Sequence, residues 1–268
     1  GNEALVLSGT SHLRINNLTF DASAGNVNTV QISGQITDVE IYGCELLANP
    51  NATSSTSAVV RYENASGAVS TLTNVRFIKN HMNGGYYAMR LYYTGGSGTN
   101  MLNNCSVQID SNLIENYYYY GLYAYYYNKL TSVSHNTFRT RPAATYQYSM
   151  YLYYYNNLDS IDGNIIEMRG TTYSYGMYIY YYNNYPSYST KPGRIINNEI
   201  RKNNSGTTSY GIYCYYYNNA EFYNNSVSLG SSGTCYGFYF YNTTSGYMVT
   251  AKNNIFHVGT MGTGYPLY

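Results

Sequence analysis

Carboxylates and histidines are the side chains through which this chain could catalyse a reaction. Catalysis by carboxylates needs side chains that converge, either as an acid–base pair or as ligands of a calcium ion. The chain contains a motif that recurs along its length. Asp110 and Asp162 occupy the same position of this motif but lie two repeat units apart, and Asp159 and Glu167 are spread along one unit. The histidines are scattered, with no Asp and Ser at the same level: His12, His81, His135 and His257. The sequence therefore predicts no catalytic residues.

The cysteines show neither a metal-binding spacing nor a disulfide framework, because Cys44, Cys105, Cys214 and Cys235 include no C-x-x-C pair. Cys214 is expected to point inward as a small core residue. Cys235 would lie five positions further along the strand direction in the next unit, roughly 16 Å away, which is too far for a disulfide. We expect free, buried thiols, no metal site and no cofactor.

The composition narrows the class of protein. The chain has 268 residues, of which 40 are tyrosine and none is tryptophan, and its formal net charge is +1. This charge implies no general attraction to nucleic acid or to an anionic membrane. No apolar run approaches the length of a membrane span, and the opening "GNEALVLSGT" does not have the pattern of a signal peptide.

Two motifs alternate strictly along the chain. The first is centred on Gly121 in "YGLYAY" and returns at Ser149, Gly176, Gly211 and Gly237. The second reads apolar-x-x-Asn-x-apolar, as in "IDSNLI" and "VSHNTF". Both consist of short alternating stretches separated by Gly, Ser and Asn, which predicts β-strands joined by turns. The count is nine units, with "YPLY" as the start of a tenth.

Strands at fixed positions, with connections of variable length, indicate an all-β solenoid in which each coil pairs with the coils before and after it. The pattern resembles the right-handed, single-stranded parallel β-helix family (pectate-lyase-like solenoids) over the whole chain. We expect one domain over residues 1–268, with tyrosine-poor coils at 1–85, tyrosine-ladder coils at 86–245, and the last coil with the start of another at 246–268.

The resemblance implies that the Asn of the second motif stacks at a coil corner, where its amide bonds backbone groups and the neighbouring amides. The ladder would consist of Asn80, Asn112, Asn136, Asn164, Asn198, Asn225 and Asn254. Cys44 and Leu18 depart from this pattern, so we expect the ladder to begin at the third coil.

Alternation places Leu122 and Ala124 inside and their tyrosine neighbours outside. One outward column would contain Tyr123, Tyr151, Tyr178, Tyr213 and Tyr239, and a second would contain Tyr92, Tyr125, Tyr153, Tyr180, Tyr215 and Tyr241. Rings about 4.8 Å apart stack favourably. The columns could stiffen the solenoid, form a binding face, or do both. The pair Tyr126 and Tyr127 falls at a corner, where one ring must turn aside.

A further outward column alternates in charge, with Glu115, Arg139, Glu167 and Arg201 on successive coils. Opposite charges across neighbouring strands stabilise the pairing and help to fix its register. We interpret this charge ladder as structural.

Asn-, Tyr- and Gly-rich β-helices of low charge resemble segments of large secreted bacterial surface proteins and adhesins. That resemblance implies a non-enzymatic, extracellular structural or adhesive role, with the chain as a segment of a longer polypeptide. Partners would be a polysaccharide or another copy through the tyrosine face, together with flanking segments. The alternative is a carbohydrate-binding or polysaccharide-cleaving module, although the short motifs of pectin-degrading β-helices are missing. An ice-binding or filament-forming solenoid is a lesser alternative.

Overall fold

The computed structural model describes residues 2–63, 71–93, 105–126, 129–142, 144–154, 157–180, 192–216, 219–241, 248–259 and 262–268. All regular elements in these ranges are β-strands, and they pair in parallel. No helix that could cross a membrane occurs in this part of the chain.

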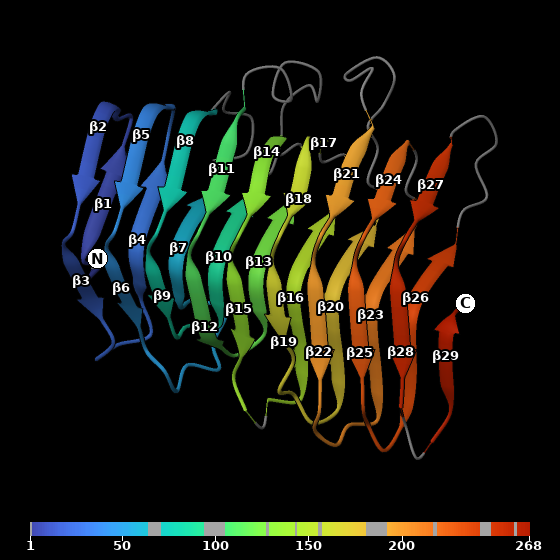
Figure 1. The fold of residues 1–268 in the computed structure, drawn as a ribbon. Helices are drawn as coiled ribbons and strands as arrows, with labels where there is room; N and C mark the ends of the chain where they lie inside the picture. Colours follow the sequence, from blue (N-terminus) through green and yellow to red (C-terminus); the bar gives the residue numbers. More distant parts are fainter. Residues whose placement is uncertain are drawn as a thin grey trace.

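Three parallel sheets run the length of the molecule, and the chain visits them in turn (Figure 1). Sheet A consists of β1 (Leu5–Ser8), β4 (Asn28–Ser33), β7 (Ala58–Glu63), β10 (Tyr87–Tyr92), β13 (Tyr120–Tyr125), β16 (Tyr146–Tyr153), β20 (Tyr173–Tyr180), β23 (Thr208–Tyr215), β26 (Thr234–Tyr241) and β29 (Gly264–Leu267). Sheet B consists of β2 (Ser11–Asn16), β5 (Ile36–Tyr42), β8 (Leu72–Ile78), β11 (Val107–Asp110), β14 (Lys129–Ser134), β18 (Ser160–Asp162), β21 (Gly193–Ile196), β24 (Ala220–Tyr223) and β27 (Val249–Lys252), and β17 (Asn157–Leu158) pairs with β14. Sheet C consists of β3 (Thr19–Ala22), β6 (Glu45–Ala48), β9 (His81–Asn83), β12 (Leu113–Tyr117), β15 (Thr137–Thr140), β19 (Ile165–Glu167), β22 (Glu199–Lys202), β25 (Ser226–Leu229) and β28 (Ile255–Val258).

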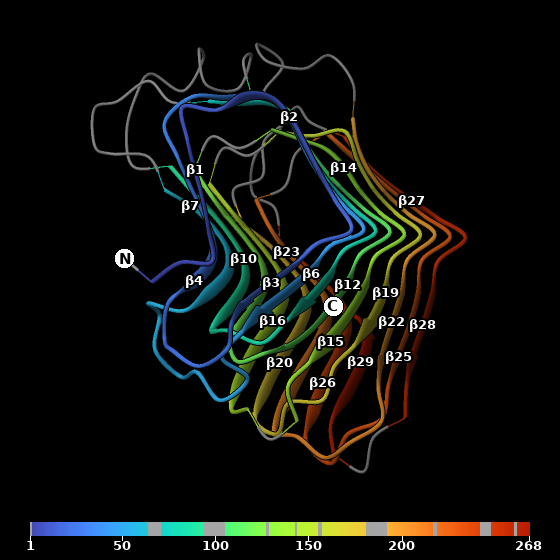
Figure 2. The ribbon, with the colours of Figure 1, turned by 90° about the vertical axis from the view of Figure 1, so that its left-hand side faces the viewer.

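The result is the predicted β-solenoid. Sheets B and C each have nine successive strands among the described residues and sheet A has ten, in agreement with nine coils and the start of another. Figure 2 shows the coils nearly end on, with the three sheets forming three sides around a common interior. Successive coils follow one another from the blue N-terminal end to the red C-terminal end in Figure 1.

The interior is filled by one apolar cluster that runs through all three sheets. In sheet A the residues predicted to point inward are buried: Leu122, Ala124, Met150, Leu152, Met177, Ile179, Ile212, Cys214 and Phe238. Phe240 packs against the cluster and is partly buried. Because the strands alternate, the same register that buries these side chains holds the intervening ones on the outside.

The corner between sheets B and C is made by a residue in the left-handed region. The residue that precedes each ladder position has φ between 54° and 64° in nine successive coils: Asn17, Gly43, Lys79, Ser111, His135, Gly163, Asn197, Asn224 and Asn253. Asn and Gly adopt this conformation most readily, which explains their frequency here. The turn aims the next side chain into the coil.

That next side chain forms the predicted asparagine ladder. The Oδ1 of Asn136 accepts hydrogen bonds from the backbone N–H and the Nδ2 of Asn112, both at 2.9 Å. Its own Nδ2 donates to the carbonyl of Ile109 at 2.9 Å and to the Oδ1 of Asn164 at 3.0 Å. The same pattern links the seven asparagines, and the first Oδ1 accepts from the backbone N–H of Cys44 at 2.9 Å. The ladder therefore begins at the third coil, as predicted, with its buried amides satisfied.

We predict that Asn136→Ala lowers the free energy of unfolding by about 3 kcal/mol or more, because it leaves two donors of Asn112 and the carbonyl of Ile109 buried without partners. Thr137→Ala, at the next and outward position, should cost less than about 1 kcal/mol. Chemical denaturation followed by circular dichroism measures both. Equal losses in the two variants would contradict a special role for the ladder.

Candidate functional site

The outer face of sheet A carries the two tyrosine columns that the sequence predicts. In the Tyr123 column the centroids of successive rings lie 4.8–5.2 Å apart, and their planes differ by 1–5°. In the Tyr92 column the spacings are 4.7–5.1 Å and the planes differ by 3–24°. These spacings follow the distance between paired strands and fall within the range of favourable offset stacking.

A third column, which alternation along the strand does not predict, runs beside them. It contains Tyr87, Tyr120, Tyr148, Tyr175, Tyr210, Tyr236 and Tyr265, with centroid spacings of 4.5–5.3 Å. Strict alternation hides it, because Gly121 and Leu122 are both buried and Tyr120 and Tyr123 therefore both face outward. A Cβ on Gly121 would lie 2.4 Å from the carbonyl oxygen of Ser149. A small residue, glycine at most positions, follows the tyrosines of this column from Tyr87 to Tyr236, and that recurrence in the sequence could have revealed the column.

The third column packs edge-on against the Tyr123 column. The Tyr148 and Tyr151 rings lie 5.2 Å apart at 86°, and the equivalent rings of the next coils meet at 85–89°. We call the three columns together the tyrosine array: Tyr87, Tyr92, Tyr120, Tyr123, Tyr125, Tyr148, Tyr151, Tyr153, Tyr175, Tyr178, Tyr180, Tyr210, Tyr213, Tyr215, Tyr236, Tyr239, Tyr241 and Tyr265. Each ring thus stacks within its column, and two columns also interlock.

Tyrosine continues around the corner at which sheet A ends. Tyr126, Tyr154 and Tyr216 have φ of 57°, 60° and 53°, a conformation that is costly for a bulky side chain. The Tyr126 and Tyr154 rings stack at 5.1 Å. The neighbouring Tyr127 lies outside the described residues. Glycine or asparagine would occupy this turn at lower cost, so tyrosine here favours a role beyond forming the turn.

Stacking decides which part of each phenol solvent can reach. Most rings in the middle of the array are partly buried, and their faces lie against the rings of the coils before and after. The accessible surface therefore consists mainly of ring edges and hydroxyl tips, repeated at the strand spacing. A sugar ring that needed an open aromatic face would find one more easily at an end of a column than in its middle.

Burial also changes the ionisation of these phenols. It raises the pKa of Tyr153 and of Tyr210 to about 12, with neighbouring phenols adding to the effect. The pKa values of Tyr151 and Tyr178 are raised further by burial and then by the adjoining tyrosines. A phenolate within the array would lose hydration and would repel ionising neighbours, so the array holds its protons.

We predict that the protein unfolds in alkali as its phenols ionise. Above pH 10 an unfolded chain releases phenolic protons that the folded array retains, so stability present below pH 10 is lost as the pH rises through 12. Phenolate absorbance and the β-sheet circular dichroism signal, followed in one titration, should change together. Titration at the ordinary pKa with the β-sheet signal intact would contradict this coupling.

One end of the array is closed by charged residues. On the coils before Tyr123, the same column holds Arg90 and Arg61. The guanidinium of Arg90 lies 4.5 Å from the centre of the Tyr92 ring and 5.5 Å from that of Tyr87. Glu63 forms ion pairs with both arginines. Beyond this cluster, towards the N-terminus, the described part of sheet A has no tyrosine column.

The charge ladder lies on sheet C, where the four predicted residues occupy one column. Arg139 contacts Glu115 at 3.7 Å and Glu167 at 3.1 Å, and Arg201 pairs with Glu167. Arg169 adds a contact to Glu167 at 3.0 Å. His81, which the sequence analysis did not connect to this ladder, lies 3.0 Å from Glu115 and 3.6 Å from Glu45.

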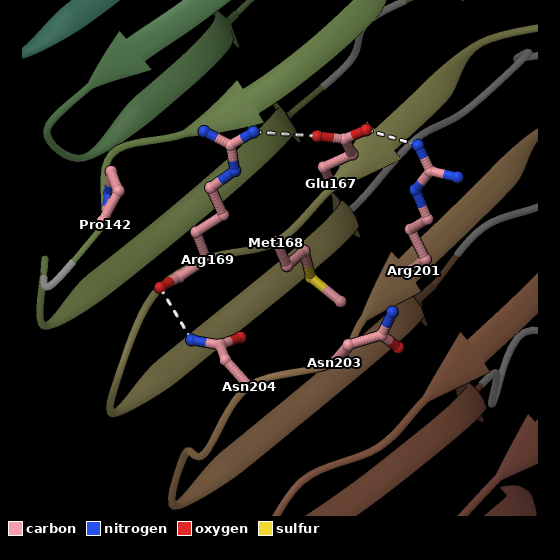
Figure 3. A pocket seen from close by; sticks show the side chains of 7 residues that line it. All are labelled: Pro142, Glu167, Met168, Arg169, Arg201, Asn203 and Asn204. Atoms are coloured by element: carbon pink, nitrogen blue, oxygen red, sulfur yellow. Dashed lines mark hydrogen bonds and ion pairs between the residues drawn. The ribbon is translucent and has the colours of Figure 1, made fainter.

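A pocket of about 500 Å³ opens beside this ladder and is lined by Pro142, Glu167, Met168, Arg169, Arg201, Asn203 and Asn204 (Figure 3). In Figure 3 the Glu167 carboxylate lies between the guanidiniums of Arg169 and Arg201. Asn204 is turned towards the backbone and donates to the carbonyl of Arg169 at 2.8 Å. The charged groups of the pocket therefore bond one another.

The surroundings of Glu167 determine its ionisation. Burial alone would raise its pKa, but the hydrogen bond from Arg201, the charge of Arg139 and the bond from Arg169 together lower it. A carboxylate held in this way stays ionised and is a poor proton donor. The pocket thus contains an anchored carboxylate rather than the acid of an acid–base pair.

We predict that Glu167→Gln lowers the free energy of unfolding by about 1–2 kcal/mol, because three guanidiniums lose the negative charge that they share and one of its two acceptor oxygens. Glu199→Gln, which removes an exposed carboxylate with one arginine contact, should cost less than about 0.5 kcal/mol. Denaturation at low and high salt tests this, since added salt should shrink the loss at Glu167. Indistinguishable variants would show that the network contributes nothing beyond isolated pairs.

Lys202 is a buried amine beneath this region that the sequence did not single out. It is 1% exposed, and its Nζ donates to the carbonyl of Gly170 and to the Oδ1 of Asn204 at 3.0 Å. Burial lowers its pKa to about 8. Between pH 8 and 10.5 this amine alone adds stability as the pH rises, which is opposite in sign to the tyrosines. Because Lys202 is almost fully buried and its amine bonds the preceding coil at Gly170, we interpret it as a bridge between coils.

The remaining candidates for chemistry stay apart or pair locally. All four cysteines are free and buried, and the Cys105 sulfur lies 3.1 Å from the hydroxyl of Tyr93. Asp110 pairs with the exposed His135 at 3.3 Å. Within the described ranges, no group of three or more His, Cys, Asp or Glu side chains is placed to hold a metal ion.

Comparisons of the chain with protein-family models, with curated proteins and with solved structures give no match.

Proposed function

We propose that this chain is a non-enzymatic, extracellular structural and adhesive β-helix, and that the tyrosine array is its contact surface. The observation that carries the proposal is the array itself: three columns of partly exposed phenols in register on one sheet. An aromatic surface of this extent on a protein usually marks an interaction site. Tyrosine suits such a surface, because its ring packs while its hydroxyl remains hydrated.

The rest of the coil supports a rigid presentation of that surface. The asparagine ladder ties seven successive corners together, and the charge ladder links successive strands of sheet C. The strained corner tyrosines, Tyr126, Tyr154 and Tyr216, indicate that the aromatic surface is maintained at some cost in stability. A solenoid needs none of these phenols to close its coils.

Polysaccharide cleavage is less well supported. Glu167 is the acidic residue lining the pocket beside the charge ladder, and its pKa is lowered rather than raised. Retaining and inverting glycosidases need a second carboxyl group about 5–9.5 Å away and an acid that keeps its proton. Binding of carbohydrate without cleavage stays compatible with the array, most readily at its C-terminal end, where Tyr241, Tyr265 and Tyr268 are exposed.

We predict that the chain binds some members of a panel of soluble and insoluble polysaccharides and abiotic surfaces, and that binding depends on the array. Changing Tyr151, Tyr153, Tyr178, Tyr180, Tyr213 and Tyr215 to Ser should abolish binding, whereas changing the same six to Phe preserves the stacks and isolates the contribution of the hydroxyls. Circular dichroism checks folding. If the Ser variant does not fold, Tyr178→Lys alone replaces it. A folded Ser or Lys variant that binds as well as the parent, or a parent that binds neither these surfaces nor itself, would refute the proposal.

A further inference from the structure

We infer that the tyrosine array pairs with the tyrosine array of a second copy of this chain, with the two rods side by side and antiparallel. The inference rests on the proposed function, because it names the partner of the same surface. From the Tyr123 row to the Tyr239 row, the outward positions of sheet A in all three columns are tyrosines. The central part of the array therefore carries no charge that would oppose contact with its own kind.

The regular spacing of the tyrosine rings along each column favours a second copy as the partner. Ring centroids within the columns repeat at 4.5–5.3 Å along six strand intervals. Two ladders of side chains interdigitate along their whole length when their repeats are the same. A second copy meets this condition at every coil, whereas a partner without stacked strands matches at only a few points.

The chemistry of the exposed groups is the second argument. A twofold interface brings the same surface together from both subunits, so the groups on it must complement themselves. A phenol hydroxyl both donates and accepts hydrogen bonds, and ring edges pack against other rings in tilted geometry. The array already contains this second contact internally, where Tyr175 and Tyr178 meet at 85°.

The area of the interface indicates how strongly the two copies would bind each other. From strand spacing and rise, the array with its corner tyrosines is about 25–30 Å long and about 20 Å wide. Pairing two such faces would bury about 1,100 Å² in total, at the low end of specific interfaces. We therefore expect weak, reversible pairing, with a dissociation constant in the micromolar range or above.

The charged residues at the N-terminal end of the tyrosine array favour antiparallel over parallel pairing of the two rods. Arg61, Glu63 and Arg90 close the N-terminal end of the array with two positive charges and one negative charge. In parallel pairing the two clusters would face each other, and like charges would repel. In antiparallel pairing the Arg90 row faces Tyr265 and Tyr268, one coil beyond Tyr239 in the other copy. Arginine and tyrosine are compatible there, as Arg90 over Tyr92 already shows.

A charge-swap experiment tests the pairing. Tyr178 lies in the middle row of the array, so it meets its own counterpart in a twofold pair. Sedimentation equilibrium should show monomer and dimer for the parent and at least tenfold weaker self-association for Tyr178→Lys and for Tyr178→Glu. An equimolar mixture of the two variants should dimerise again. Tyr223→Lys, a partly buried tyrosine on sheet B, is the matched control and should dimerise like the parent.

Direction is tested with single cysteines, since the native cysteines are buried. Antiparallel pairing predicts oxidation of Tyr123→Cys with Tyr239→Cys to a mixed disulfide dimer and little homodimer of either variant. A parent that stays monomeric up to about 1 mM, a mixture that does not recover pairing, or variants that dimerise like the parent would overturn the inference. Array-dependent binding to polysaccharide by a monomeric parent would overturn it while leaving the adhesive function intact.

Discussion

Parallel strand pairing at one fixed repeat is the constraint on which this structure depends. Hydrogen bonds between coils hold equivalent residues about 4.8 Å apart in each sheet. Asparagine amides, phenol rings and opposite charges can all bond or stack at that distance, so each residue type forms its own ladder. The coil fixes the spacing between equivalent residues, and the side-chain type at each position determines whether they form hydrogen bonds, stacked rings or ion pairs.

The ladders differ in what they leave for solvent. Six of the seven ladder asparagines are buried, and their amides bond backbone groups and one another, so they stabilise the corner and present little outside. The charges on sheet C bond one another, and Glu167 holds three guanidiniums. The tyrosines also pack against one another through their faces, yet nearly all of them, Tyr87 excepted, stay partly exposed along the array. Among the described features, this combination is what makes the array, rather than the pocket beside Glu167, the better candidate for contact with a partner.

Much of this architecture follows from residue spacing alone. The alternating motifs predict the coils, the corner asparagines and two of the three tyrosine columns, because one side chain in each unit must point inward for the core to close. The Tyr87 column was not predicted, since two successive inward residues interrupt the alternation at Gly121 and Leu122. Lys202 and the position of Arg169 were not predicted either. Lys202 ends β22 in register with the buried Leu229, at an inward position where an apolar residue is expected. The position of Arg169 depends on how the connection after β19 folds back, and no periodic pattern records that path.

The shared register has a consequence for how such a surface changes over generations. A residue inserted within a strand of sheet A would turn every following side chain of that strand to the opposite face and interrupt each tyrosine column beyond the insertion. Duplication of an entire coil does no such damage, because the new coil enters with its asparagine, its inward residues and its tyrosines already in place. The tyrosine array therefore becomes longer or shorter by whole coils, and the number of coils that the gene encodes determines its length.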